Sequence, residues 1–174
     1  GYGLLGDPSS SQSGIIIPKP ADNQKYYIFS IDDVDAGGGA SGLNYTLVDM
    51  TLDGFKGDVV TSQKNVNLTK PLCEKVTAVG HANGFDTWVI TQKWNTNDFY
   101  VYLITNEGVN ETPIISTTGT VIGGGIDNAK GYMKVSPDGT TIAKGNAGLR
   151  MVEIFDFDNE TGIVSNGYLD ASMG

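Results

Sequence analysis

The chain has 174 residues, of which 24 are glycine and 18% are charged, and its formal net charge is −9. This length allows a substantial hydrophobic core, and the glycine-rich, weakly charged composition favours a turn-rich all-β protein over a helical one. The basic residues are scattered, which argues against nucleic acid and anionic membranes as partners, because both require concentrated positive charge. The longest purely apolar run, Ile15-Ile16-Ile17, is too short for membrane insertion.

The first round of predicted strands follows a serine-rich loop. These strands are rich in aromatic and β-branched residues, and no window shows the apolar spacing of a helix. A glycine-rich loop over 32–42 joins the second strand to the third, and Asp53-Gly54 turns the chain after the third. The four strands of this round are expected at residues 15–18, 25–31, 43–52 and 58–68.

Two further rounds of strands follow. Pro71 marks the boundary before the second round, and Gly123-Gly124-Gly125 separates the second from the third. In the third round, Ser136-Pro137-Asp138-Gly139 has the composition of a tight turn, since proline presets a negative φ and glycine accepts a positive one. The expected strands are 75–81, 87–94, 98–105 and 113–117, then 133–135, 141–144, 151–157 and a last one from 163 onward.

The rounds are evenly spaced. Gly54, Gly108 and Gly162, each directly after a third strand, recur every 54 residues, close to the length of a propeller blade. Strand 98–105 is apolar or aromatic on both faces, as expected for a sheet buried between two neighbours, whereas a β-sandwich would show cleaner polar alternation. We therefore predict an all-β fold, a segment of about three four-stranded antiparallel β-propeller blades, with the β-sandwich as the alternative.

The predicted domain is a single propeller segment over 1–174, with blades at 14–70, 71–125 and 126–174. Known propellers use four to eight blades, so three cannot close a ring. The faces of the end blades then require neighbours, which we expect to be further blades of the same protein rather than another chain.

The ordered set of motifs resembles a family of large secreted bacterial surface proteins, in which a WD40-like or TolB-like β-propeller precedes repeat domains and a type IX secretion sorting domain. Its members are described as gliding-motility-associated. The resemblance covers nearly the whole chain and implies blades before Gly1 and after Gly174, and a secreted or cell-surface location. The motifs that carry it are GLLGDPSSSQSGIIIPKP, KYYIFSIDD, GLNYTLVDMTLDGFKGDV, EKVTAVGHANGFDTWVI, GYMKVSPDGTTIA and VEIFDFDNETGIVSN.

Two acidic groups are candidates for chemistry. Asp32, Asp33 and Asp35 precede three glycines, and their oxygens are of the type that binds calcium, but the spacing is not that of an EF-hand. We favour an exposed acidic turn there. Asp156 and Asp158 share a strand face and could act as paired glycosidase carboxylates, but turn formation is the favoured role.

The remaining candidates are single residues. His81 is the only histidine and has no metal or triad motif around it, so a structural role is expected. Cys73 is the only cysteine, which excludes a disulfide within this chain, and no basic cluster activates it. Trp88 and Trp94 lie six residues apart on one predicted strand and are expected to fill the core on the same face, with Trp94 the more exposed.

These observations predict a non-enzymatic propeller scaffold whose loops bind protein or glycan at the cell surface, with no catalytic, metal or cofactor residues assigned. A structural subunit that assembles through open blade faces is the alternative. An enzyme acting on polysaccharide is the least favoured hypothesis.

Overall fold

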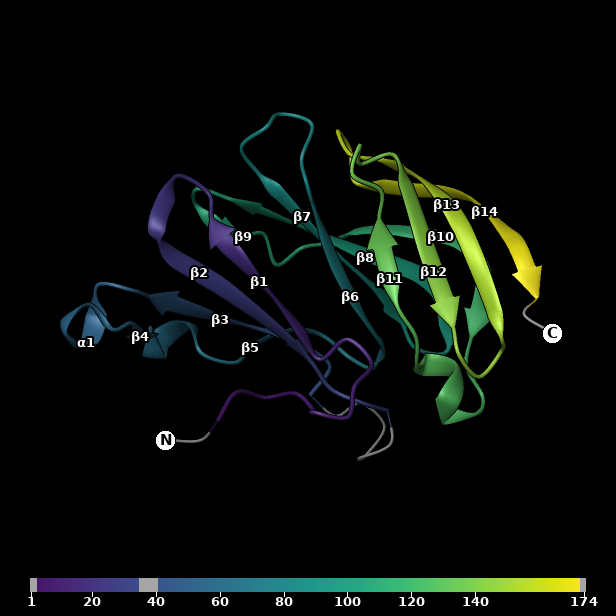
Figure 1. The fold of residues 1–174 in the computed structure, drawn as a ribbon, viewed down its shortest axis with the longest axis horizontal. Helices are drawn as coiled ribbons and strands as arrows, with labels where there is room; N and C mark the ends of the chain where they lie inside the picture. Colours follow the sequence, from purple (N-terminus) through teal and green to yellow (C-terminus); the bar gives the residue numbers. More distant parts are fainter. Residues whose placement is uncertain (1–2, 35–40, 173–174) are drawn as a thin grey trace.

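Three antiparallel sheets stand side by side in the computed structural model, which describes residues 3–34 and 41–172 (Figure 1). Each sheet is built from strands that are consecutive in the sequence. The first contains β1 (Gly14–Lys19), β2 (Asp22–Ile31), β3 (Leu43–Asp49), β4 (Asp58–Val59) and β5 (Val66–Thr69). The second contains β6 (Leu72–Gly80), β7 (Thr87–Lys93), β8 (Thr96–Thr105), β9 (Gly108–Val109) and β10 (Ile114–Ile122). The third contains β11 (Met133–Val135), β12 (Thr141–Asn146), β13 (Met151–Asp158) and β14 (Ile163–Ser172).

The turn after the third strand of each sheet depends on glycine, as the repeat predicts. Gly54, Gly108 and Gly162 have φ values of 63°, 136° and 76°, a region that glycine enters without steric cost. In the first sheet this turn is the short element α1 (Leu52–Phe55), in which Asp53 and Gly54 both have left-handed rather than helical dihedrals. The all-β prediction is confirmed, and no helix of the described residues is long and apolar enough to cross a membrane.

The outer strands differ from the sequence-based expectation. The strand predicted over 58–68 is split into β4 and β5 by the 3-10 helix η1 (Thr61–Gln63). The break is stabilised by Asn65, which has a φ of 56° and donates its N–H to the Thr46 hydroxyl at 3.0 Å. In the second sheet β10 runs on to Ile122, because its pairing with β8 shifts register after Thr117.

The second sheet is covered on both faces, which explains why its central strand has no polar face. Tyr102 and Ile104 of β8 pack against the first sheet, in a cluster with Tyr27. Phe99 and Val101, which point to the opposite face, pack against the third sheet. Face-to-face stacking of three sheets is therefore observed, and a two-layer sandwich is excluded for the described residues.

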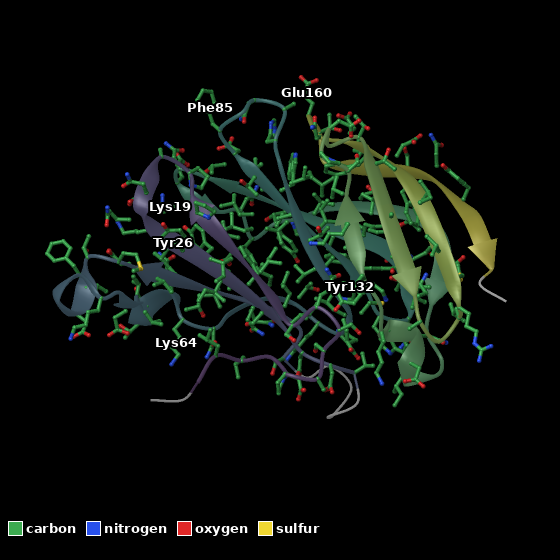
Figure 2. All side chains as sticks on the ribbon, viewed as in Figure 1. Lys19, Tyr26, Lys64, Phe85, Tyr132 and Glu160 are labelled. Atoms are coloured by element: carbon green, nitrogen blue, oxygen red, sulfur yellow. The ribbon has the colours of Figure 1, made fainter. Side chains whose placement is uncertain are left out.

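The two outer faces of the stack carry apolar side chains that no described sheet covers. On the first sheet Ile16, which points away from the buried Ile17, is 67% exposed. On the third sheet Tyr168 of β14, the cross-strand partner of Ile154 on β13, is 56% exposed. Figure 2 shows side chains filling the spaces between the three sheets, whereas these outer faces are open.

Candidate functional site

The first strands of the three sheets, β1, β6 and β11, lie next to one another (Figure 1). These strands begin at one end of the molecule, which we call the strand-start end. It includes segments 7–13 and 123–132. Segment 7–13 joins the strands there, because Gln12 exchanges two hydrogen bonds with the backbone of Met133, at 3.2 and 2.8 Å. Two segments distant in sequence are therefore held together at the start of β6.

Glu74 lies at this junction, on β6, and is completely buried. Its Oε2 accepts hydrogen bonds from the Ser11 N–H at 3.0 Å and the Ser11 hydroxyl at 3.3 Å. Its Oε1 is buried and has no hydrogen-bond partner among the described residues. Burying a carboxylate oxygen without a partner is costly, so such a group calls for an explanation, and a catalytic role is one.

Lys75, the next residue, is also completely buried. Its Nζ donates one hydrogen bond, to the Ala129 carbonyl at 2.6 Å. Burial lowers the pKa of Lys75 to about 8, and the charge of Lys144 acts in the same direction. A lysine with a pKa near 8 exchanges its proton close to neutral pH, while its protonated form can stabilise a developing oxyanion.

A second buried lysine, Lys144 on β12, has a full set of partners. Its Nζ lies 2.8 Å from Glu153 Oε2 and 3.0 Å from Gln92 Oε1. Glu153 also accepts hydrogen bonds from the Asn146 amide at 3.0 Å and the Thr120 N–H at 2.7 Å. Burial opposes ionisation of Glu153, but its bonds to Lys144 and Thr120 outweigh it and hold the pKa of this carboxyl below its ordinary value. The two residues are cross-strand partners within the third sheet, and their bonds to Gln92 on β7 and Thr120 on β10 connect this sheet to the second one.

The acidic group predicted at 32–35 is partly present. Oxygens of Asp32 and Asp33 lie within 4.8 Å of one another and of Asp7, a residue that the sequence analysis did not single out. Asp35 lies outside the described residues. The Ser9 hydroxyl lies 2.6 Å from Asp7 Oδ1 and 2.8 Å from Asp33 Oδ2, so its one proton can be donated to either, and the Ser41 N–H donates to Asp32 at 2.8 Å. These are the bonds of an acidic turn, but the turn is not fully exposed as predicted, because Asp33 is buried under the Ser9 segment. The oxygens are also of the kind that calcium prefers.

The other acidic candidates stabilise a turn. Asp158 accepts hydrogen bonds from the backbone of Glu160 and from the backbone and hydroxyl of Thr161. Asp156 is exposed and accepts a hydrogen bond from the Asn166 amide at 2.7 Å. The structure does not place a second carboxylate opposite them across a cavity in the described residues.

The single-residue candidates also take structural positions. His81 Nδ1 accepts the Asn83 N–H at 2.9 Å, and its ring stacks on Trp88 at 5.1 Å. Cys73 is buried, and burial raises the pKa of its thiol to about 11. Trp88 and Trp94 are both buried, but not in one cluster: β7 ends at Lys93, and the chain turns before Trp94 can continue the same face.

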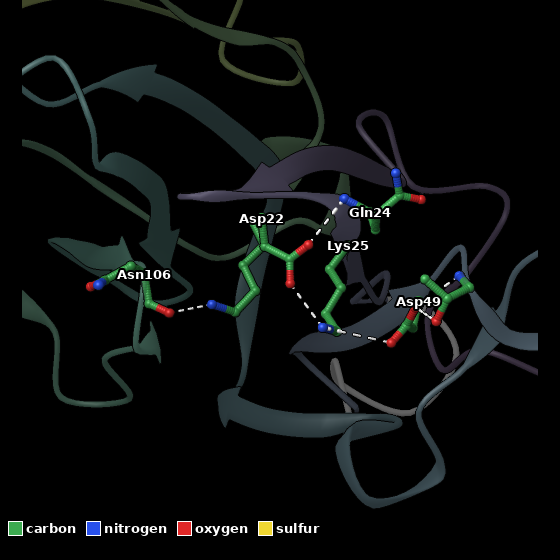
Figure 3. Close-up of polar contacts among 7 residues, drawn as sticks. Asp22, Gln24, Lys25, Asp49 and Asn106 are labelled. Atoms are coloured by element: carbon green, nitrogen blue, oxygen red, sulfur yellow. Dashed lines mark hydrogen bonds and ion pairs between the residues drawn. The ribbon is translucent and has the colours of Figure 1, made fainter.

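A hollow of about 600 Å³ lies at the opposite end of the first sheet, beside Lys19, Asp22 and Phe85. Phe85 is 82% exposed, and Figure 2 labels it together with Lys19. The charges of the hollow are compensated by neighbouring groups. Lys25 lies 2.8 Å from Asp22 and 3.7 Å from Asp49, and Lys19 donates to the Asn106 carbonyl (Figure 3). Partly exposed pairs of this kind contribute little to stability.

No family model and no curated protein matches this sequence. Among solved structures, a putative 6-phosphogluconolactonase from Bacteroides fragilis is similar with a TM-score of 0.54 at 13% identity, over 95% of this chain and 45% of its own. The periplasmic gluconolactonase of Pseudomonas aeruginosa is similar with a TM-score of 0.50 at 16% identity, over 88% of this chain and 39% of its own. The chain has a propeller-type fold. An auxiliary nutrient binding protein from Bacteroides thetaiotaomicron is similar with a TM-score of 0.47 at 16% identity, over 86% of this chain and 30% of its own.

These neighbours correct the functional prediction. The chain spans less than half the length of each of these structures. The two with TM-scores of at least 0.50 are both named as lactonases. The prediction of a non-enzymatic scaffold that binds protein or glycan is therefore contradicted, because both of these neighbours are named as enzymes.

The sequence analysis also missed the two buried ionisable residues at the strand-start end. Glu74 and Lys75 occur as an adjacent charged pair at the start of β6, LCEKVTAVG, whose other residues are apolar or small apart from one threonine. Two adjacent charged residues in a strand that is otherwise apolar could have indicated a functional site, since charged residues are rarely buried unless they are paired.

Proposed function

We propose that this chain is part of an enzyme that hydrolyses a sugar lactone, with its reacting centre at Glu74 and Lys75. Two propeller-fold neighbours named as lactonases support the class of reaction. The observation that carries the proposal is the unpartnered, completely buried Glu74 Oε1 beside a lysine whose pKa is lowered to about 8. A lysine with a strongly lowered pKa is found more often at functional sites than elsewhere.

The proposed reaction assigns one role to each residue. Glu74 takes a proton from a water molecule, whose oxygen forms a bond to the lactone carbonyl carbon. The protonated Lys75 stabilises the negative charge that develops on the carbonyl oxygen. The bond from that carbon to the ring oxygen then breaks, and the ring oxygen leaves as a hydroxyl with the proton returned by Glu74. The products are the open-chain sugar acid and the unmodified enzyme.

Access to this centre requires segment 7–13 to move, because this segment covers Glu74. The described contacts of the cover to Glu74 are few: the two Ser11 bonds to the carboxylate and the Gln12 N–H bond to the Glu74 carbonyl at 3.2 Å. Movement of such a loop to admit substrate is common in hydrolases.

The test is hydrolysis of glucono-δ-lactone by the protein that contains this chain, before and after Glu74→Gln. Glutamine keeps the size of the side chain and an acceptor for Ser11 but cannot take a proton from water. The rate is expected to fall by about 10²–10⁴-fold, with no change from the matched control Glu107→Gln in the β8–β9 turn. No hydrolysis by the unmodified protein, or an equal rate in Glu74→Gln, contradicts the proposal.

We also propose that further blades of the same protein cover the outer faces of the stack. The support is the exposure of Ile16 and Tyr168 on those faces, together with the greater length of the propeller neighbours. In the complete protein, a cysteine introduced by Ile16→Cys is expected to be protected from thiol reagents. Rapid labelling of that cysteine in the complete, folded protein contradicts this.

The family and location are likewise proposals. The motifs quoted above, from GLLGDPSSSQSGIIIPKP to VEIFDFDNETGIVSN, support membership of the secreted, gliding-motility-associated surface proteins of the type IX secretion pathway. A bacterial secreted or cell-surface location follows from that resemblance. Fractionation of the source cells is expected to find the protein outside the cytoplasm, and recovery in the cytoplasm contradicts it.

A further inference from the structure

A hollow of about 330 Å³ lies at the strand-start end of the third sheet. One wall is the 3-10 helix η2 (Ile126–Ala129) with the residue that follows it, and the other is the turn between β12 and β13 (Figure 1). The residues that line it are Asp127, Lys130, Ala147, Gly148 and Arg150.

The walls of this hollow are fixed by backbone contacts. The Ala147 N–H donates to the Lys130 carbonyl and the Gly148 N–H to the Asp127 carbonyl, each at 3.0 Å. Gly148 packs so closely that an added Cβ would lie 2.3 Å from the Asn128 side-chain oxygen. The hollow is therefore a built feature rather than a gap between two mobile loops.

The charge of the hollow is opposite to that of the chain. Arg150 is the only arginine in a chain of net charge −9. Its guanidinium has no hydrogen bond or ion pair with any described residue, and its φ of 51° is uncommon for a residue with a side chain. Lys130 lies 2.8 Å from Asp127, so two cations and one carboxylate line the hollow.

We propose that this hollow binds one small oxyanion, a phosphate or carboxylate group, through a bidentate contact from Arg150 with Lys130 beside it. A guanidinium matches the geometry of these groups, and an arginine without an internal partner has its donors available for them. The site lies at the same end as Glu74 and Lys75, and η2 connects the two, since Lys75 donates to the Ala129 carbonyl. This inference rests on the proposed function. If both hold, the substrate class is an anionic sugar lactone that carries a phosphate or a carboxylate.

The experiment is a calorimetric titration of the protein that contains this chain with inorganic phosphate, acetate and glucose, each in turn. The probe anions are expected to bind and glucose is not. Arg150→Ala is expected to weaken anion binding about tenfold or more, Arg150→Lys to recover part of it, and Lys134→Ala, an exposed lysine of β11 outside the hollow, to leave it within about twofold. Tighter binding of phosphate identifies a phosphorylated sugar, and tighter binding of acetate identifies a sugar acid.

The proposal is overturned if neither anion binds, or if Lys134→Ala weakens binding as much as Arg150→Ala. Failure of the proposed function gives a different result: anion binding that depends on Arg150, but no hydrolysis of either glucono-δ-lactone or its 6-phosphate. In that case the anion site stands and only the assignment to a lactone substrate is lost.

Discussion

The two interfaces between the sheets bury different kinds of side chain. Between the first and second sheets the buried cluster is hydrocarbon and aromatic, with Phe29 and Leu47 facing Val89 and Ile104. Between the second and third sheets an aromatic cluster surrounds charge, with Lys144 5.2 Å from the Phe99 ring centroid and 5.0 Å from that of Phe155. Burial of apolar area stabilises the first interface directly, whereas a buried ion pair loses much of its attraction to desolvation. The difference indicates that the first interface serves stability and the second also positions polar groups.

The largest effect is expected from breaking the buried ion pair. Glu153→Ala leaves the Lys144 ammonium buried without its carboxylate and is expected to lower the free energy of unfolding by about 3–5 kcal/mol. Denaturant unfolding of the variant and the unmodified protein measures this.

The double variant Lys144→Met, Glu153→Met is the control. It removes both charges and is expected to recover most of the loss, because the cost arises from the uncompensated charge. If the double variant is as unstable as Glu153→Ala, packing rather than charge explains the effect.

At the apolar interface, Ile104→Val removes one methylene from a completely buried side chain. The free energy of unfolding is expected to fall by about 0.5–1.5 kcal/mol, and by the same amount at every pH from neutral to mildly alkaline. Unfolding series at several pH values test this, and a loss that varies with pH would remove the distinction between the two interfaces.

The interface that contains Lys75 is expected to depend on pH. The pKa of Lys75 is about 8 in the folded protein and 10.5 ordinarily, so above pH 8 the unfolded chain binds more protons and stability rises with pH. Cys73, with its pKa raised from 9.0 to about 11, acts in the opposite direction above pH 9. Between pH 8 and 9 the free energy of unfolding is expected to increase by up to about 1 kcal/mol.

Lys75→Met serves as the matched control for this pH series. It is expected to reduce the rise strongly, leaving the smaller part from Lys144, whose pKa is also lowered by burial. Unchanged pH dependence in this variant would show that Lys75 is not the group responsible.

The fold could be predicted from the sequence because the signals that define its strands and turns are local and are repeated along the chain. Alternating aromatic strands and evenly spaced glycines define the sheets, and the two apolar faces of β8 predict that it is covered on both sides. The site was not predicted, because it depends on contacts between distant segments. Gln12 and Met133 are 121 positions apart, and Asp7 meets Asp32 and Asp33 because its N–H donates to the Ile31 carbonyl at the end of β2.

The most direct test of the claim that the buried Lys75 serves chemistry is to measure lactone hydrolysis and stability together in Lys75→Met. Removing a buried ammonium is expected to leave the free energy of unfolding at pH 7 equal or higher, because the desolvation cost of the charge disappears. Hydrolysis of glucono-δ-lactone is expected to fall by about 10²–10³-fold, because the developing oxyanion loses its cation. Hydrolysis that continues at the original rate, or that falls only in step with a loss of folded protein, would contradict the account.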